Sequence, residues 1–217
     1  MRAQRASKPP EIFLASRNAK KLAEMDRILA PLVPGVRVLG LDDVTAYDEP
    51  VEDQPTFEGN ALLKARAGLA ATGLPTLADD SGLCVDALNG MPGVLSARWS
   101  GPPTETNLGQ DARNNRLLLD QLADVPDERR AGHFVCAVAF CHPDGTELVV
   151  EGRMDGHILR ETRGSGGFGY DVLFTAVEHP QLTTAELDAT EKDLISHRGR
   201  ALRQIAPLVA RRLATER

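Results

Sequence analysis

The 217-residue sequence contains few cysteines and no long apolar run. These two features argue against a disulfide-rich protein, a cysteine-ligated zinc protein and a membrane-spanning protein. The cysteines are Cys84, Cys136 and Cys141, an odd number without Cys-x-x-Cys spacing, which argues against a disulfide framework or a zinc site. Cys136 and Cys141 lie in one strand-like run at odd spacing, so we expect them on opposite faces, as small buried apolar residues in a reducing compartment. No apolar stretch approaches the roughly 18 residues of a membrane helix, so we expect no membrane partner.

The sequence also lacks an excess of basic residues and has few aromatic ones. Its net charge is −6 at pH 7, aromatic residues make up 4% of the chain, and Trp99 is the single tryptophan. A nucleic-acid-binding surface needs a basic footprint or aromatic stacking platforms, so we expect no nucleic-acid partner. A small anionic substrate is compatible with this charge where basic side chains and a metal ion gather locally.

The first ten residues differ from the rest of the chain. They contain three basic residues but no following apolar segment, which argues against a secretory signal. Two prolines end the segment, so we predict a disordered tail over residues 1–10 and a single domain over residues 11–217. The length suits one domain with ample core, and we expect the protein to be cytoplasmic.

Strand-like and helix-like patterns interleave along the chain. Thr56 is a candidate N-cap for a helix that ends before Gly73, and Asp144-Gly145 marks a hairpin. The predicted strands span residues 11–15, 36–41, 75–78, 133–141, 147–152 and 170–174, and the predicted helices span residues 19–32, 56–71, 104–123 and 197–213. This order favours an α/β fold with a mixed sheet, in which loops at the strand ends gather the ligand site.

Four polar clusters are candidates for chemistry, and we expect each on such a loop. The first, Ser16-Arg17-Asn18-Ala19-Lys20-Lys21, follows a strand and opens a helix. Unpaired N–H groups and the positive dipole end of a helix N-terminus favour phosphate, and Ser, Asn and Lys side chains add donors and charge. The segment predicts a phosphate cradle, although an ordinary N-cap with surface lysines has the same residues.

The second cluster, Asp79-Asp80-Ser81-Gly82, follows an apolar strand. Two adjacent carboxylates there favour a hard cation such as Mg²⁺, and a water held nearby could be a nucleophile. Neighbouring side chains on a strand point to opposite sides, so only one carboxylate needs to face a cleft. An Asp that supports a turn before Gly82 is the alternative.

The third cluster is the glycine-rich segment from Gly164 to Asp171. It fits Gly-x-Gly-x-x-Gly, but no strand precedes it and a strand rather than a helix follows, which argues against a dinucleotide-binding loop. Such a loop suits close approach of backbone to a ligand, with Phe168 stacked on a base. A flexible turn with Phe168 in the core is the alternative.

The fourth cluster joins Lys192 with Ser196-His197-Arg198 at the start of the last helix. His and Arg can donate to a carbonyl oxygen and a ring nitrogen of a purine. Exposed basic residues at a helix start are the alternative. The sequence has no Gly-x-Ser-x-Gly and no His-Glu-x-x-His, which argues against common serine hydrolases and zinc proteases.

Together the clusters resemble the inosine/xanthosine triphosphate pyrophosphatase family, in the family's order over about residues 12 to 205. The matching segments are Leu14–Lys21, Thr56-Phe57, Asn60-Ala61, Lys64-Ala65, Ala78–Leu83, Pro92-Gly93, Ser96–Arg98, Gly166–Asp171 and Ser196–Arg198. The resemblance implies an elongated, two-lobed fold with a central substrate cleft, a homodimer and a Mg²⁺ cofactor. It also implies hydrolysis of ITP, dITP and XTP to the monophosphate and pyrophosphate, which cleanses the nucleotide pool.

The resemblance implies roles for individual residues. Asp80 is the implied catalytic carboxylate, which activates water or holds the metal, and Glu52 is a second implied metal ligand. The implied substrate-binding residues are Ser16, Arg17, Asn18, Ala19, Lys20, Lys21, Ser81, Phe168, Gly169, Tyr170, Asp171, Lys192, His197 and Arg198. Gly59 departs from the family, because many relatives carry Glu there; Glu58 or Glu52 would have to replace that acid.

Two other classes of function stay open. Maf-like pyrophosphatases of modified pyrimidine nucleotides have a similar cleft, but their N-terminal loop usually reads Ser-x-Ser-Pro-Arg-Arg, whereas this loop contains Asn18, Lys20 and Lys21. A nucleotide-binding regulatory module that has lost its chemistry is the non-enzymatic alternative, and the intact Asp79-Asp80 pair argues against it.

Overall fold

The computed structural model describes residues 10–19, 22–23, 26–27, 31, 35–102 and 108–214. The predicted tail over residues 1–10 lies outside these ranges except for its last residue. Ala19, Leu22, Ala23, Asp26 and Arg27 are helical, as predicted for residues 19–32, and the rest of that helix lies almost entirely outside the described residues. None of the described helices is long and apolar enough to cross a membrane.

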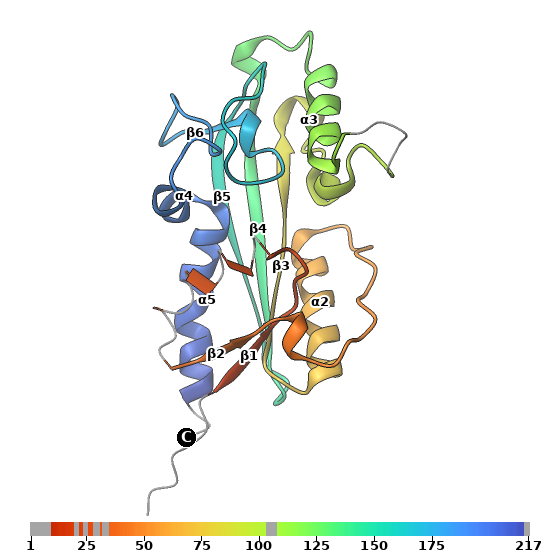
Figure 1. The fold of residues 1–217 in the computed structure, drawn as a ribbon, viewed down its shortest axis with the longest axis vertical. Helices are drawn as coiled ribbons and strands as arrows, with labels where there is room; N and C mark the ends of the chain where they lie inside the picture. The colour runs from red at the N-terminus through yellow and green to blue at the C-terminus, as the bar shows by residue number, and fades with distance from the viewer. Residues whose placement is uncertain are drawn as a thin grey trace, which may run out of the picture.

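A six-stranded mixed sheet forms the centre of the fold and is flanked by helices, which confirms the predicted α/β class (Figure 1). The strand order is β2-β1-β3-β4-β5-β6. The strands are β1 (Glu11–Leu14), β2 (Arg37–Leu39), β3 (Thr76–Val85), β4 (Ala131–Cys141), β5 (Glu147–Ile158) and β6 (Phe174–Ala176). β1 pairs in parallel with both β2 and β3, whereas the pairs β3–β4, β4–β5 and β5–β6 are antiparallel. The β4–β5 hairpin turns at Asp144-Gly145 as predicted, and Gly145 has φ 90°.

The described helices are α2 (Phe57–Thr72), α3 (Gln110–Gln121), α4 (Ala189–Ile195) and α5 (His197–Ala214). Short 3₁₀ helices are η1 (Leu41–Asp43), η2 (Asp86–Leu88), η3 (Gly93–Arg98), η4 (Asp127–Arg129) and η5 (Asp171–Leu173). Both predicted caps of α2 are confirmed. The Oγ1 atom of Thr56 accepts from the backbone N of Gly59, and Gly73 adopts the left-handed conformation at φ 68°.

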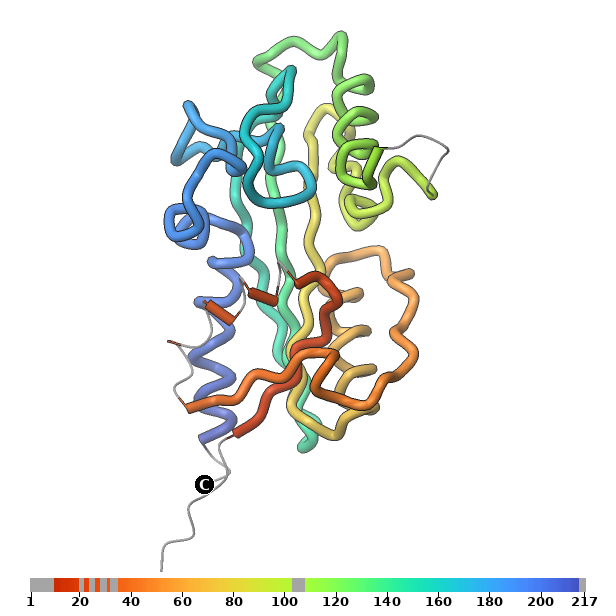
Figure 2. Tube along the Cα trace, viewed as in Figure 1, coloured from red at the N-terminus to blue at the C-terminus, as the bar shows by residue number. Residues whose placement is uncertain are grey.

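Helices α5 and α2 cover opposite faces of the sheet at one end of the molecule (Figure 1). Leu77, Cys136 and Val138 pack with α5 in one apolar cluster, whereas Ala78 and Cys141 pack with α2 in another. The two cysteines therefore face opposite sides, as predicted. A third cluster lies toward the other end of the long strands, where Figure 2 shows α3 and the loop between β5 and β6. The two-lobed shape with a cleft stays a prediction.

The largest departure from the sequence prediction concerns β3. We expected Asp79 to Gly82 on a loop after a strand that ends at Ala78, and this prediction is wrong. β3 continues through the cluster to Val85, paired with β4 along its whole length. The continuous ladder and the polar partners of the Asp side chains outweigh the low strand propensity of Asp and Gly.

Three other segments also differ from the prediction. The strand expected over residues 170–174 is η5 followed by β6, because the Asp171 carboxylate accepts from the Phe168 backbone N at 2.8 Å and favours a turn. The helix expected from residue 104 begins at Gln110; Leu108 is 52% exposed, and residues 103–107 lie outside the described residues. Helix α4 was not predicted, although the capping box of Asp188 and Glu191 is visible in the sequence.

Candidate active site

Asp79 and Asp80 lie in the middle of β3, where they are 2% and 6% exposed. They pair with Val138 and Ala137 of β4. Because side chains alternate along a strand, Asp79 lies on the α5 face of the sheet and Asp80 on the α2 face. The expectation that the two carboxylates point to opposite sides is therefore confirmed.

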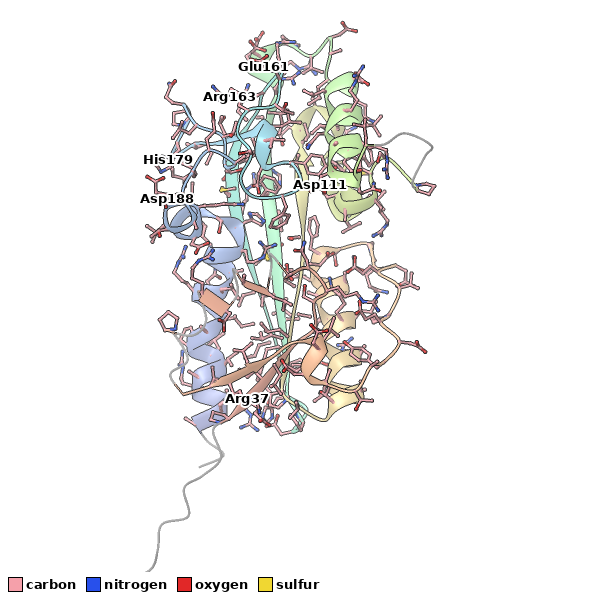
Figure 3. All side chains as sticks on the ribbon, viewed as in Figure 1. Arg37, Asp111, Glu161, Arg163, His179 and Asp188 are labelled. Carbon is pink, nitrogen blue, oxygen red and sulfur yellow. The ribbon has the colours of Figure 1, made fainter. Side chains whose placement is uncertain are left out.

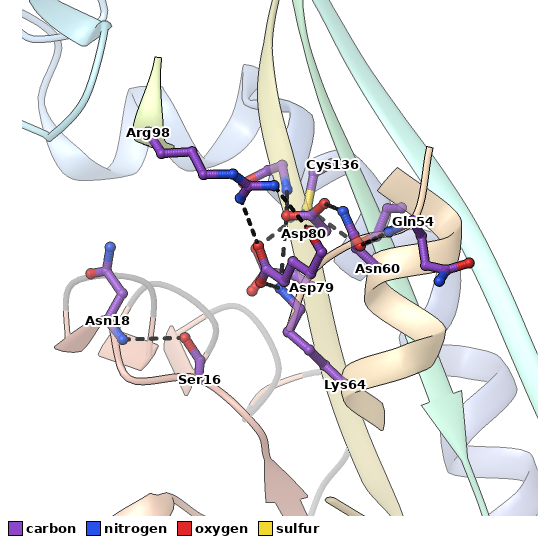
Figure 4. A network of polar contacts seen from close by, with 12 residues as sticks. Ser16, Asn18, Gln54, Asn60, Lys64, Asp79, Asp80, Arg98 and Cys136 are labelled. Carbon is purple, nitrogen blue, oxygen red and sulfur yellow. Dashed lines mark hydrogen bonds and ion pairs between the residues drawn. The ribbon is translucent and has the colours of Figure 1, made fainter. Parts of the chain in front are cut away.

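Asp80 is held by groups from the first turns of α2 and from its own strand. Asn60 Nδ2 donates to Asp80 Oδ2 at 2.9 Å, and the backbone N of Ser81 donates to Asp80 Oδ1 at 3.1 Å. Lys64 Nζ lies 3.7 Å from Asp80 Oδ1 (Figure 4). Asn60 and Lys64 lie one turn apart on α2, so the capped start of this helix fixes both donors.

Glu52 joins this network through Lys64. Lys64 Nζ donates to Glu52 Oε1 at 2.6 Å, and Arg98 Nη2 donates to the backbone oxygen of Glu52 at 2.9 Å. Burial opposes the charge of Lys64, but the carboxylates of Asp79, Asp80 and Glu52 outweigh it and raise its pKa above the ordinary value. Lys64 is therefore an ammonium ion between two carboxylates.

The donor set on this face fits a hard cation. The residues that the structure describes contain no cluster of three His, Cys, Asp or Glu side chains able to hold a metal alone. Nevertheless, Glu52 and Asp80 both approach the ammonium of Lys64, so their oxygens converge where positive charge is favoured. Mg²⁺ commonly takes one or two protein carboxylates and completes its shell with water and substrate phosphates.

On the opposite face Asp79 contacts Arg198, the second residue of α5. Arg198 Nη2 lies 3.4 Å from Asp79 Oδ2 and 3.1 Å from Ser81 Oγ. Cys136 Sγ lies 3.9 Å from the same Asp79 oxygen. The Arg198 and Asp79 side chains are each 1% exposed, so this is an ion pair in the interior.

A pocket of about 150 Å³ adjoins Arg198 and collects most of the predicted substrate-binding residues. The predicted residues that line it are Asn18, Ser81, Phe168, Gly169, Tyr170, Asp171, Lys192, His197 and Arg198. The residues that the sequence prediction missed are Gly82, Ser96, Ala97, Asp111, Asn114 and Phe134. The close packing of Ser96 and Gly93 on β3 requires a glycine at position 82, because a Cβ atom there would lie 2.4 Å from Ser96 Oγ and 2.5 Å from the Gly93 backbone oxygen.

Aromatic rings and cations together form one side of this pocket. Lys192 Nζ and Arg198 Cζ lie 5.3 and 5.6 Å from the centre of the Phe168 ring. Lys192 Nζ also donates to Asp171 Oδ2 at 2.6 Å, and His197 stacks on Phe134 with 4.9 Å between ring centres. This side of the pocket presents the flat apolar ring of Phe168 with hydrogen-bond donors beside it, which suits a heterocyclic base.

Helix α3 connects two walls of the pocket. Asn114 Nδ2 donates to the Ser96 backbone oxygen at 3.2 Å, and that oxygen also accepts from Tyr170 Oη at 2.9 Å. Asp111 accepts from the Gly169 backbone N at 2.7 Å, and Figure 3 shows Asp111 at the start of α3. Burial raises the pKa of Tyr170, so its hydroxyl stays a donor at physiological pH.

The loop after β1 is shared between two cavities. Asn18 lines the pocket described above, whereas Ser16, Arg17 and Ala19 line a neighbouring cavity of about 640 Å³. The backbone N of Asn18 donates to Ser16 Oγ at 3.3 Å, and exposed Arg17 pairs with Glu49. Lys20 and Lys21, the cationic part of the predicted phosphate cradle, lie outside the described residues.

Gly59 lies in the first turn of α2, where many family members were expected to carry Glu. A Cβ atom at this position would lie 2.8 Å from Gln54 Cβ, so the chain before α2 packs directly on Gly59. Glu52 and Glu58 line the same cavity, and Glu52 also pairs with Lys64 beside Asp80. Of the two acids proposed to replace the missing Glu, Glu52 therefore has a direct contact with the Lys64–Asp80 network.

The mixed sheet, the buried carboxylates and the base-sized pocket define an α/β protein with a polar site around β3. The model of the Ham1 family matches residues 12–208, and the chain belongs to this family. It is 60% identical to a protein of Nocardia farcinica named dITP/XTP pyrophosphatase, over 92% of this chain and 94% of that protein. A protein of the same name from Corynebacterium efficiens is 54% identical over 92% and 97% of the two chains.

Solved structures give the same assignment. A nucleoside-triphosphatase, or dITP/XTP pyrophosphatase, of Mycobacterium abscessus is 53% identical, with a TM-score of 0.72 over 91% of this chain and 99% of the other. A HAM1 protein of Coxiella burnetii is 40% identical, with a TM-score of 0.81 over 93% and 99% of the chains.

Proposed function

We propose that this chain is a Mg²⁺-dependent pyrophosphatase that hydrolyses dITP, ITP and XTP to the monophosphate and pyrophosphate. One observation carries the proposal: consecutive residues of β3 lie in two different polar environments. Asp80 lies beside Lys64 on the α2 face, whereas Ser81 lines the base-sized pocket with Arg198. A nucleoside triphosphate presents a base and a reactive phosphate that need these two environments. The names of the relatives support the substrate class.

Asp80 is the proposed catalytic carboxylate. Asn60 and the Ser81 backbone N fix its orientation, which positions an oxygen to accept a proton from the attacking water. The water oxygen forms a bond to the α-phosphorus, and the bond from that phosphorus to the bridging oxygen of pyrophosphate breaks. Lys64 and Lys192 offset negative charge near the site, so catalysis is mainly positioning and electrostatic stabilisation.

Glu52 and Asp80 are the residues that would hold Mg²⁺. The ion would supply positive charge to the triphosphate and its leaving group. Ser16, Arg17, Asn18, Ala19, Lys20 and Lys21 are proposed to bind the phosphates.

Base selectivity follows from the donors in the pocket. Hypoxanthine and xanthine present a carbonyl at the 6-position, where adenine presents an amino group. His197 and Arg198 are proposed to donate to that oxygen, with Phe168 stacked on the ring. An adenine amino group would leave buried donors without an acceptor, at about 1–3 kcal/mol each, which disfavours ATP. We also propose that the enzyme is a cytoplasmic homodimer.

Pyrophosphate release from ITP, XTP, GTP and ATP, each with and without Mg²⁺ at mildly alkaline pH, tests the proposal. We expect Mg²⁺-dependent release from ITP and XTP, with ATP nearly inert because it lacks the 6-oxygen. GTP carries the 6-oxygen and should be nearly inert through exclusion of its 2-amino group, not through His197 and Arg198. A folded protein that binds ITP but releases no pyrophosphate would instead be a regulatory module. Equal turnover of ITP and ATP would contradict the role of His197 and Arg198.

A further inference from the structure

We propose that Asp79 is a positioning residue for base recognition, which holds the Arg198 guanidinium in the orientation that donates to the 6-oxygen of the purine. The inference rests on the proposed function of the pocket and adds a residue that does not line it. Asp79 acts through Arg198 and needs no contact with the substrate.

The geometry places one guanidinium against both the carboxylate and the pocket. Arg198 Nη2 lies 3.4 Å from Asp79 Oδ2 and 3.1 Å from Ser81 Oγ, in the interior of the protein. The same guanidinium lines the pocket and has its Cζ atom 5.6 Å from the centre of the Phe168 ring. The guanidinium is planar and rigid, so a contact that holds one of its nitrogens also sets the directions of its other N–H groups.

The backbone of Arg198 is fixed separately by the packing of α5 on β5. A Cβ atom at Gly152 would lie 2.1 Å from the His197 backbone oxygen, so the first turn of α5 lies directly on the strand. The backbone N of Gly199 donates to Ser196 Oγ at 3.0 Å. With the backbone fixed, the remaining freedom of Arg198 is the rotation of its long side chain, and Asp79 restricts that rotation.

Stability alone does not account for this pair. A buried ion pair is often no more stabilising than apolar residues of the same volume, because both charges lose their water. The function of an arginine at this position is instead in the pocket, where its N–H groups can donate to a carbonyl oxygen of the base. Asp79 compensates the buried charge, which keeps Arg198 as a directed donor.

Two substrates separate positioning from a general structural role: ITP, and purine riboside 5′-triphosphate, which lacks the 6-oxygen. For wild-type protein we expect kcat/KM on ITP to exceed that on purine riboside triphosphate by at least about tenfold. In D79N we expect kcat/KM on ITP to fall by about tenfold and that on purine riboside triphosphate by no more than about twofold. The variant D79E, which restores the charge, should recover part of the preference.

The control is D155N, because Asp155 also pairs with an arginine, Arg153, at 2.7 Å, but on the surface of β5 away from the pocket. Its substrate ratio should equal that of wild type. Turnover of purine riboside triphosphate by D79N also reports that the variant is folded. S81A removes a second contact of the Arg198 guanidinium, so it should shift the ratio in the same direction, and it serves as the test where D79N does not fold.

The proposal is overturned if D79N loses both activities equally, because the pair would then be structural, or if S81A and D79N leave the ratio unchanged. The failure of the proposed function has a different signature. Wild-type protein that releases no pyrophosphate from either substrate would refute the enzymatic reaction itself. Wild-type protein that hydrolyses both equally would refute recognition of the 6-oxygen, and with it the role of Asp79.

Discussion

Asp79 and Asp80 are consecutive residues on one strand, but their surroundings differ. Asp79 pairs with the Arg198 guanidinium in the interior, with both side chains 1% exposed. Asp80 lies in a network with Asn60 and Lys64 that extends to Glu52, whose side chain is 31% exposed. The surroundings of Asp79 exclude solvent and suit a residue that fixes another side chain. The surroundings of Asp80 reach solvent through Glu52 and suit the entry of water, phosphate and a cation. Identical side chains can therefore have different tasks because of the face they occupy.

The largest effect should come from D80N. D80N removes the carboxylate proposed to act on the attacking water, so we expect kcat for pyrophosphate release from ITP to fall about 10³-fold, or ~4 kcal/mol of barrier. Initial rates with saturating Mg²⁺ and ITP measure this. A fall of less than about tenfold would remove Asp80 from the catalytic role.

The next effect should be on the stability of D79N. Removing the carboxylate of a buried ion pair takes away negative charge beside Arg198, so the free energy of unfolding should fall by about 3 kcal/mol. Urea titration followed by circular dichroism measures it, with E52Q as the matched variant on the other face. E52Q should cost less than about 1 kcal/mol, because its ion pair is partly exposed. Equal losses of unfolding free energy in D79N and E52Q would show that the surroundings of Asp79 are no more buried in effect than those of Glu52.

A smaller effect should appear in the metal requirement of E52Q. Glu52 is proposed to share Mg²⁺ with Asp80, so the Mg²⁺ concentration for half-maximal rate should rise about fivefold, with kcat at saturating Mg²⁺ changed by less than about twofold. A Mg²⁺ titration of the initial rate measures this, and D155N provides the control. A rise in D155N as large as that in E52Q would exclude a specific role for Glu52.

The smallest effect should be that of alkaline pH on the contribution of Lys64. Its folded pKa lies above the ordinary 10.5, so its charge, and any stability from it, is fully present below that pH and is lost only as pH rises through the folded pKa. The ratio of wild-type to K64Q rates should therefore stay constant from about pH 7.5 to 10. A ratio that declines within this window would show that the carboxylates do not hold the Lys64 proton.

Local sequence signals predicted the parts of the fold that depend on local chemistry. The caps at Thr56 and Gly73 and the turn at Asp144-Gly145 were correct, because capping and turn geometry are set by a few neighbouring residues. The course of β3 through Asp79 to Gly82 could not be read locally. Those residues favour turns alone, and the strand forms because β4 provides a ladder and distant side chains bind the carboxylates.

The pocket shows the same division. Ser81, Phe168 to Asp171, Lys192, His197 and Arg198 were predicted and lie together, because each stands in a motif of unusual composition. Ser96, Asn114 and Phe134 were missed as site residues, and Asn60 and Lys64 had no predicted role. Asn60, Lys64 and Ser96 stand in segments that match the family, but neither their composition nor their spacing indicates a role, and only the folded chain brings them to the site. The alternation of side chains along a strand nevertheless predicts, from the sequence alone, that the two carboxylates lie on opposite faces.

The pairing of β3 with β4 makes the spacing along this strand a determinant of the reaction. The register joins Thr76 to Cys141 and continues without a break to Val85 and Gly132. Removal of one residue between Thr76 and Ala78 would turn every later side chain to the other face. The carboxylate of Asp80, proposed to act on water, would then meet Arg198, and that of Asp79 would face Lys64. Single-residue insertions and deletions in β3 should thus be tolerated far less than substitutions, even at positions that touch no ligand.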